Sequence, residues 1–259
     1  MILIFMSVTL QSCRVSILVK ALPQRSATQG ETVCCAGVTP NGEFKRLFPV
    51  RFRHLADEAT FKRWDWVDFK YRLPTSDRRS ESCRVWEDSI VVNGEMPPND
   101  RAPFLNRLVS ASFREAEAAG RSLALIRPRN TRFYYKPKKP DELEQERRIY
   151  ADAARQDSFF DERLKALEPS PYDFRFKFED AAGQHDCANG DWEAHAMFYH
   201  QQRRTGSAQA ALDWMNAKFN DEYPRKGMLF CLGNMAKRPQ TWQLLGVLRV
   251  DDTGQMALF

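Results

Sequence analysis

The sixteen residues from His185 to His200 hold most of the side chains in this chain that could do chemistry. They read HDCANGDWEAHAMFYH and include three of the four histidines. A thiolate, imidazoles and carboxylates form a donor set that binds zinc or another transition metal. In a helix that starts near Asp191, this residue and His195 stand four apart and share one face. The candidate metal ligands are therefore His185, Cys187, Asp191 and His195.

The same segment also has a purely structural interpretation. Asn189 or Asp191 would cap a helix, and Glu193 in its first turn would complement the helix dipole. His195 and His200 would then lie on the surface of that helix. The sequence leaves both interpretations open.

Two further catalytic arrangements can be assembled nearby. Two-metal nuclease chemistry needs clustered carboxylates with a lysine close by, and a suitable set is Lys177, Glu179, Asp180, Asp191 and Glu193. The catalytic candidates are Asp191, Glu193 and His185, and zinc or magnesium would be the cofactor. Alternatively, Cys187 would act as a nucleophile with His185 as its base. The chain has no P-loop, GxGxxG, GxSxG or HExxH motif, so the commonest nucleotide and hydrolase sites have no support.

A second notable segment, Arg121 to Lys139, mixes positive charge with aromatic rings. It reads RSLALIRPRNTRFYYKPKK and holds seven Lys or Arg, three aromatics and no acid. Cations that contact phosphates and rings that stack on bases are what a nucleic acid requires. The candidate contacts are Arg127, Arg129, Arg132, Tyr134, Tyr135, Lys136, Lys138 and Lys139, extended by Arg51, Arg53, Arg78 and Arg79.

Other interpretations of these charges stay open. A run of cations is usually a solvated face, and this run could also pair with the acidic helix that follows it. Aromatic residues and arginine are enriched at protein interfaces as well, so a structural subunit that contacts other proteins is a further alternative.

The net charge of +5 and the pI near 8.9 are modest for 259 residues. Affinity for a polyanion must therefore come from clustering of charge. Between Arg14 and Arg84 there are fourteen basic and eight acidic residues, whereas Asp141 to Glu168 holds nine acids and five bases. Charge is segregated along the chain.

The six cysteines show no CxxC pair, which argues against structural zinc of the paired-cysteine kind and against a disulfide framework. Reduced thiols in a cytoplasmic protein are the expectation. The opening MILIFMSVTLQSC is too short to span a bilayer and lacks a basic start. We expect residues 1–13 to be an extension, and no membrane as a partner.

The N-terminal part is predicted to be rich in strands. Val15 to Val19, Thr32 to Val38, Glu43 to Val50, Phe61 to Tyr71 and Val85 to Val92 have strand patterns, with a short helix near His54 to Thr60. An Asn41-Gly42 turn between two such runs is a strong hairpin signal. A small twisted sheet or half-barrel is expected, followed by a helix over Asp100 to Gly120.

The C-terminal part is predicted to mix helices and strands. The clearest strand is Tyr172 to Phe178, in which Tyr172, Phe174, Phe176 and Phe178 alternate with charged residues. Strands are also expected at 123–126, 228–232 and 242–250, and helices at 140–167, 191–203 and 207–219. The fold class is α+β, with an extension over 1–13, a β-rich module over 14–126 and an α+β lobe with helices inserted between strands over 127–259.

Several strings resemble a family of uncharacterised bacterial proteins of this length: ETVCCAGV, FKRLFPVRFRHL, WDWVDF, SDRRSES, LIRPRN, HDCANGDWE and MLFCLGNMAKRPQTWQLLGVLRV. The resemblance runs from Arg14 onward. That family is associated with mobile-element and phage-defence gene neighbourhoods, so it implies a bacterial cytoplasmic setting. It implies no activity and no catalytic residue.

These observations favour a cytoplasmic nucleic-acid-binding protein, for DNA or RNA, that works as a component of a larger defence or mobile-element machine with other protein subunits. The alternatives are a metal-dependent nuclease or related hydrolase centred on His185 to Glu193, and a structural interaction subunit.

Overall fold

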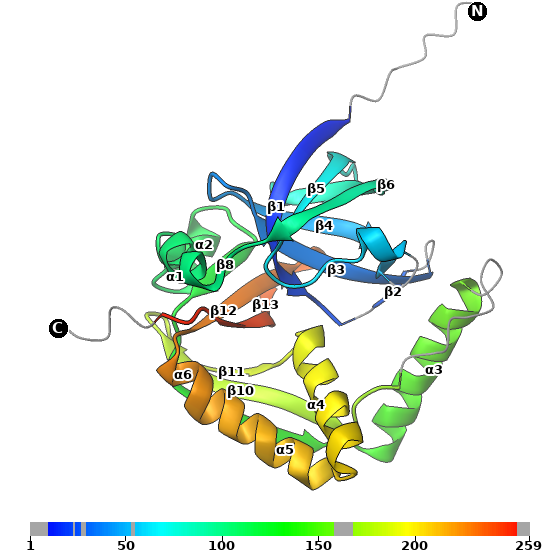
Figure 1. Ribbon diagram of the computed structural model, residues 1–259, viewed down its shortest axis with the longest axis vertical. Helices are drawn as coiled ribbons and strands as arrows, with labels where there is room; N and C mark the ends of the chain where they lie inside the picture. Colours follow the sequence, from blue (N-terminus) through cyan, green and yellow to red (C-terminus); the bar gives the residue numbers. More distant parts are fainter. Residues whose placement is uncertain (1–9, 23, 27–29, 53–54, 158–167, 253–259) are drawn as a thin grey trace, which may run out of the picture.

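The computed structural model describes residues 10–22, 24–26, 30–52, 55–157 and 168–252 (Figure 1). It combines strands and helices, and the predicted α+β class is confirmed. The first strand, β1, runs over Gln11–Lys20 and pairs with β5, Asp65–Arg72, from Gln11 onward. Residues 11–13 are thus part of the fold, whereas residues 1–9 of the predicted extension lie outside the described residues.

Five N-terminal strands close into a barrel. They follow the order β1-β5-β6-β4-β3, and pairing between β1 and β3 completes the ring. The neighbours are antiparallel except for β4 and β6, which are parallel. The remaining elements here are β2 Gln24–Ser26, β3 Gly30–Val38, β4 Phe44–Val50, η2 Asp57–Ala59, β5 Asp65–Arg72 and β6 Ser82–Glu95.

This pairing is that of the OB fold, a five-stranded Greek-key barrel. Counted in chain order, the first barrel strand pairs with the second and fourth, and the third pairs in parallel with the fifth. The predicted small sheet or half-barrel is therefore a closed barrel. Its topology assigns no ligand by itself.

Strand β5 alternates buried and more exposed residues, which points one set of its side chains into the barrel. Strand β1 is buried on both faces from Val15 to Val19, because its outer face also packs on the rest of the protein. Buried residues such as Ile17, Leu47 and Phe69 fill the barrel interior. The predicted hairpin joins β3 to β4, and Gly42 has a φ of 91° there. Glycine adopts this left-handed conformation without steric cost, which explains its place in the turn.

The rest of the chain forms two sheets with helices. One sheet has the order β11-β10-β9 and the other β13-β12-β8-β7. The elements are α1 Pro98–Asn106, β7 Val109–Ser110, α2 Phe113–Ala118, β8 Leu123–Ile126, β9 Arg129–Pro137, α3 Pro140–Asp157, β10 Tyr172–Asp180, β11 Gly183–Ala188, α4 Trp192–Thr205, α5 Ala208–Ala217, η3 Lys218–Glu222, α6 Tyr223–Arg225, β12 Met228–Met235 and β13 Arg238–Arg249. None of the described helices is long and apolar enough to cross a membrane.

The alternation predicted for β10 is confirmed. Phe174, Phe176 and Phe178 are buried. Phe176 and Phe178 each pack edge-on against Phe230 of β12, with ring centroids 5.1 and 5.0 Å apart. One face of the three-stranded sheet therefore belongs to the core shared with α4 and α5. The opposite face carries the charged residues of the alternation.

The prediction of one helix over Asp100 to Gly120 is wrong. α1 ends at Asn106, and β7 then pairs in parallel with β8 before α2 begins. Ser112 is extended, with a φ of −155°, and its side chain accepts a hydrogen bond from the amide of Glu115. This cap starts a new helix, so helical spacing of the apolar residues did not require one continuous helix.

The barrel packs tightly against the four-stranded sheet. Residues of β1, β3 and β4 share one core with residues of β8, β12 and β13. At Gly246 of β13, a Cβ atom would lie 2.8 Å from the Cγ2 atom of Val19. Only glycine lets the two layers approach this closely.

We expect Gly246→Ala to lower the free energy of unfolding by about 1–3 kcal/mol, because the added methyl group overpacks the contact with Val19. Urea denaturation of the purified protein measures this. In a Val19→Ala background the same change should cost less, since the clashing methyl group is gone. An equal cost in both backgrounds would contradict the proposed close contact.

Candidate nucleic-acid interface

The predicted basic and aromatic segment becomes strand β9, and the strand period divides it between two faces. Phe133 is buried, and Tyr135 packs on the core beside Tyr172, with ring centroids 5.5 Å apart. Arg132, Tyr134 and Lys136 lie on the opposite side, where both cations are exposed and Tyr134 is half-buried. Tyr135 is thus a core residue, and the other three face outward.

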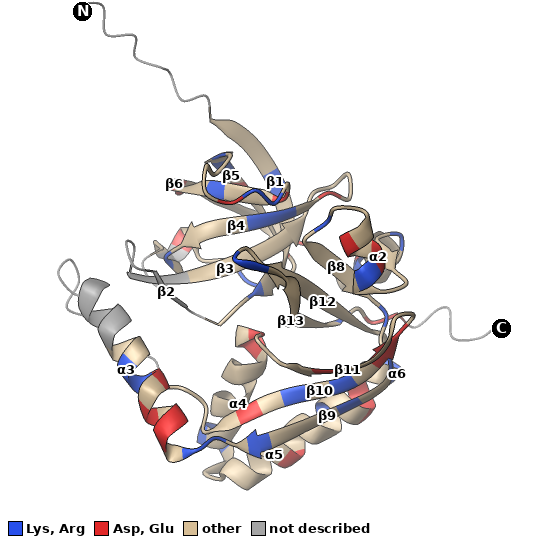
Figure 2. Ribbon diagram, turned by 180° about the vertical axis from the view of Figure 1, so that it is seen from behind, with Lys and Arg blue, Asp and Glu red and all other residues tan. Residues whose placement is uncertain are grey.

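Strand β10 adds two cations to the same side. Tyr134 lies opposite Arg175, and Arg132 lies opposite Lys177. We call Arg132, Tyr134, Lys136, Arg175 and Lys177 the outer sheet face. In Figure 2 blue segments mark β9 and β10, which lie in front of α4 and α5 in that view, with no helix across them. Arg175 and Lys177 were not among the predicted contacts. The alternation of charged and aromatic residues in β10 could have identified them, because it predicts that both side chains point outward.

Tyr134 is held firmly in this face. Its hydroxyl donates to the carboxylate of Asp186 on β11 at 2.7 Å and accepts from Nε of Arg175 at 3.1 Å. The Nζ atoms of Lys136 and Lys177 lie 5.6 and 5.8 Å from the centre of the Tyr134 ring. Burial works against the charge of Arg175, but hydrogen bonds to Asp173, Tyr134 and Asp186 outweigh it and raise its pKa. Arg175 therefore positions the ring, and the lysines are free to contact a ligand.

The charge on this face is balanced only in part: Lys136 lies opposite Asp173 and Lys177 lies opposite Asp186, whereas Arg132 has no acid directly opposite on β10. Arg132 and Lys177 stand directly opposite each other on neighbouring strands, an arrangement that destabilises a sheet. Neither side chain forms an ion pair with any residue that the structure describes. An anion bound here would relieve that repulsion.

Most of the other predicted contacts have structural partners. Arg127 donates to Asn106 at 2.6 Å and Arg129 to the carbonyl of Asp180 at 3.3 Å, and Lys138 pairs with Glu146 at 2.6 Å. Arg51 pairs with Glu87 at 2.8 Å. Of these other predicted contacts, Arg78 and Lys139 are exposed, and their side chains have no partner among the described residues. Arg53 lies outside the described residues.

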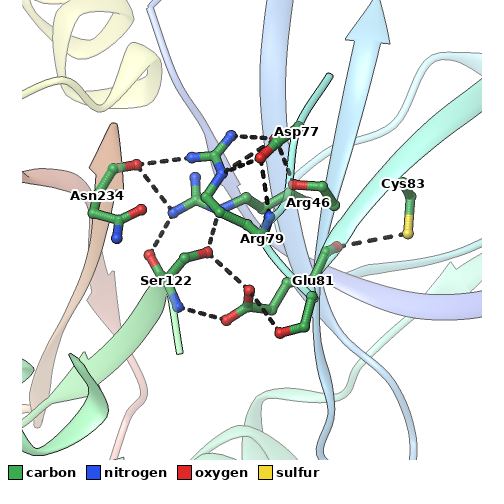
Figure 3. A network of polar contacts seen from close by, with 9 residues as sticks. Arg46, Asp77, Arg79, Glu81, Cys83, Ser122 and Asn234 are labelled. Carbon is green, nitrogen blue, oxygen red and sulfur yellow. Dashed lines mark hydrogen bonds and ion pairs between the residues drawn. The ribbon is translucent and has the colours of Figure 1, made fainter. Parts of the chain in front are cut away.

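Arg79 belongs to a network that joins the barrel to the four-stranded sheet β13-β12-β8-β7, called the second sheet below (Figure 3). Its Nη1 atom donates to the carbonyl of Asn234 at 2.8 Å, and Asp77 holds its other nitrogens. Arg46 of β4 donates from Nε to the hydroxyl of Ser122 at 3.0 Å. The carboxylate of Glu81 accepts the Ser122 amide at 2.7 Å. The predicted phosphate contact at Arg79 is therefore a structural link.

The contact between the barrel and the second sheet covers part of the barrel surface. In OB folds the face of the second and third strands binds oligonucleotides. In this chain those strands are β3 and β4, and Ala36, Val38 and Phe44 on them are buried in the core shared with the second sheet. That part of the barrel is closed to a ligand.

The structure does not bring the four candidate metal ligands together. His185 bonds to Asp180 at 2.8 Å, and Nε2 of His195 lies 3.1 Å from the carbonyl of Asn189. Cys187 packs at the edge of the core. Among the residues described, no group of three or more His, Cys, Asp or Glu side chains could hold a metal ion.

Asp191 has a structural role that explains its burial. Both of its oxygens accept Nη2 of Arg63, at 2.8 and 2.7 Å, and it also accepts the amides of Val247 at 2.9 Å and Glu193 at 3.0 Å. The last bond is the predicted helix cap. Burial opposes the charge of Arg63, yet Asp191 and Glu193 outweigh it and raise its pKa. Arg63 lies 128 residues away in sequence, so no local pattern could predict this pair.

The catalytic candidates lie in structural contacts of their own. Glu193 lies 3.4 Å from Nε of Arg63 and 3.6 Å from Lys20. The imidazole of His185 packs on Phe113 and Phe178. Burial raises the pKa of Cys187, which is the reverse of what activates a thiol nucleophile. All six cysteines are free thiols.

Residues 105–259 match a domain of unknown function, DUF8757. The chain belongs to the DUF8757 family. Residues 11–110 match a second domain of unknown function, DUF8758, so the DUF8757 part follows the barrel almost directly. Neither description names an activity.

Comparison with curated proteins found no match. Among solved structures, the chain is similar to one in a replication protein A heterotrimer bound to ssDNA, with 10% identity and a TM-score of 0.24. The match covers 93% of this DUF8757 chain and 66% of the other. The OB topology assigned above rests on strand pairing alone.

We expect Asp191→Ala to lower the free energy of unfolding by about 3–5 kcal/mol, because it leaves the buried guanidinium of Arg63 without its partner. Urea denaturation checks this, with Asp213→Ala on the exposed face of α5 as the matched control. An Asp191→Ala protein as stable as the control would show that the pair is not structural.

Burial lowers the pKa of His195 to about 4 from its usual 6.5. The neutral ring is favoured in the folded state, so this contribution to stability is complete above pH 6.5 and is lost as the pH falls towards 4. Between pH 7 and 5 the loss should be about 2 kcal/mol. Unfolding of His195→Gln across this range should show a smaller pH dependence, whereas exposed His200→Gln should match the unaltered protein.

Proposed function

We propose that this protein binds nucleic acid through the outer sheet face. The observation that carries the proposal is the pair of like charges, Arg132 and Lys177, which lie directly opposite each other beside a ring that hydrogen bonds hold in place. Arg132 has no ion-pair partner among the described residues, and the Nζ atoms of Lys136 and Lys177 lie beside the Tyr134 ring. Cations and ring thus form one surface that can contact a phosphate and its sugar or base. Both requirements of nucleic-acid binding are met within a few residues of one sheet.

Each side chain has a role in this proposal. Arg132, Lys136 and Lys177 contact phosphates and release their counterions. Tyr134 presents its ring, and Asp186 and Arg175 fix its orientation through its hydroxyl. Contacts of this kind position a strand without reading its sequence, so DNA and RNA are both substrates for the test.

The nuclease alternative has less support. Its carboxylates are divided between Arg63, which holds Asp191, and His185, which holds Asp180. No cluster in the described part of the chain would bind the metal that such an enzyme needs. A role in a bacterial defence or mobile-element machine, in the cytoplasm and with other subunits, stays a prediction from the sequence resemblance.

Fluorescence anisotropy with labelled DNA and RNA across a salt series tests the proposal. Binding should weaken with salt, and the variant Arg132→Ala, Lys136→Ala, Lys177→Ala should bind about tenfold more weakly or worse. Its salt slope should fall by about one for each phosphate contact removed.

The control is Arg148→Ala, Arg203→Ala, Arg225→Ala, which removes the same charge from exposed helix positions. Equal loss in both triple variants would mean that total charge, and not this face, drives binding. No binding by the unaltered protein at low salt would refute the proposed function.

A further inference from the structure

A second group of rings and cations lies on the outside of the barrel. Phe48 of β4 and Trp86 of β6 are 45% and 56% exposed, which is unusual for rings of this size. Between and beside them lie three exposed cations, Lys70 and Arg72 on β5 and Arg84 on β6. We call these five residues the barrel patch.

The strand register places the patch residues next to one another. Phe48 is opposite Arg84, and Arg84 is opposite Arg72 on its other side. Trp86 is opposite Lys70 and stands two residues beyond Arg84. Residues two apart on a strand are about 7 Å apart and share a face, and neighbouring strands are about 4.8 Å apart. Phe48, Arg84 and Arg72 therefore form one cross-strand row, and Trp86 and Lys70 form the next, so that the two rings are diagonal neighbours within reach of one extended strand of ligand.

Neither the like charges of the patch nor its exposed rings stabilise the fold. Arg72 and Arg84 are like charges directly opposite each other, which destabilises the pairing of β5 and β6. None of the three cations forms an ion pair or side-chain hydrogen bond with a described residue. Two large rings are also left in water.

Nearby carboxylates do not neutralise the patch. Glu87 is occupied by the amide and guanidinium of Arg51, and Asp68 by Arg14 at 2.6 Å. Asp88 is exposed and follows Trp86 where β6 departs from its regular register with β5. The three cations of the patch, Lys70, Arg72 and Arg84, therefore have no ion-pair partner among the described residues.

We propose that the barrel patch binds single-stranded nucleic acid, with bases stacked on Trp86 and Phe48 and phosphates on Arg72, Arg84 and Lys70. Bases of a duplex are stacked on each other, so flat rings select an unpaired strand. The patch is open, whereas the neighbouring β3–β4 region is closed by the second sheet. This inference shares with the proposed function the premise that the chain binds nucleic acid, but it concerns a separate site.

The test compares labelled single strands and duplexes in the same anisotropy assay. Phe48→Ala with Trp86→Ala should weaken single-strand binding about 5- to 150-fold for each ring that stacks, with little effect on duplex. Trp86→Phe should keep most of the affinity because it retains a ring. The matched control is Leu73→Ala with Val91→Ala, which removes exposed apolar side chains of the same barrel, 62% and 53% exposed.

The outcomes separate the two sites. Unchanged single-strand binding in the Phe48, Trp86 variant, with loss in the outer sheet variant, overturns this inference and leaves the proposed function standing. Loss in the Phe48, Trp86 variant with normal binding in the outer sheet variant supports the barrel patch and overturns the outer sheet face. Equal loss in the Leu73, Val91 control also overturns this inference, and no binding by the unaltered protein overturns both.

Discussion

The buried ion pair between Arg63 and Asp191 holds the two halves of this protein together. Arg63 precedes β5 of the barrel, Asp191 caps α4, and both also bond to the backbone of Val247 in β13. A charge pair at 8% and 1% exposure is tolerated because further hydrogen bonds satisfy it: Arg63 donates to the carbonyl of Val247, and Asp191 accepts the amides of Val247 and Glu193. This contact and the links made by Arg46 and Arg79 fix the relative position of the barrel and the four-stranded sheet together with the apolar core that the two share.

This rigid joint determines which surfaces are open. Two groups of arginines matter here: those that join layers, such as Arg46, Arg63 and Arg79, and those that face solvent without an ion-pair partner among the described residues, such as Arg72, Arg84 and Arg132. The arginines of the first group stabilise the fold and cannot contact a ligand. Positive charge of the second group remains on sheet faces, where the strand period places it beside aromatic rings.

The same kind of pairing explains why the candidate ligands in the segment from His185 to His200 do not come together among the described residues. Its residues are those that a metal would select, but each has a separate structural partner. His195 packs on Phe174, with ring centroids 5.0 Å apart, and His185 helps to close the hairpin of β10 and β11. Burial at these positions makes the groups less available for chemistry.

Local patterns in the sequence determined the elements and the direction of many side chains. The alternation of β10, the Asn41-Gly42 turn and the Asp191 cap are short-range features, and short-range geometry decides them. The closed barrel, the break between α1 and α2 and the Arg63–Asp191 pair depend on residues far apart in the chain. Only the tertiary structure could decide which cations are paired and which are free, because a charge is neutralised by what lies near it in space.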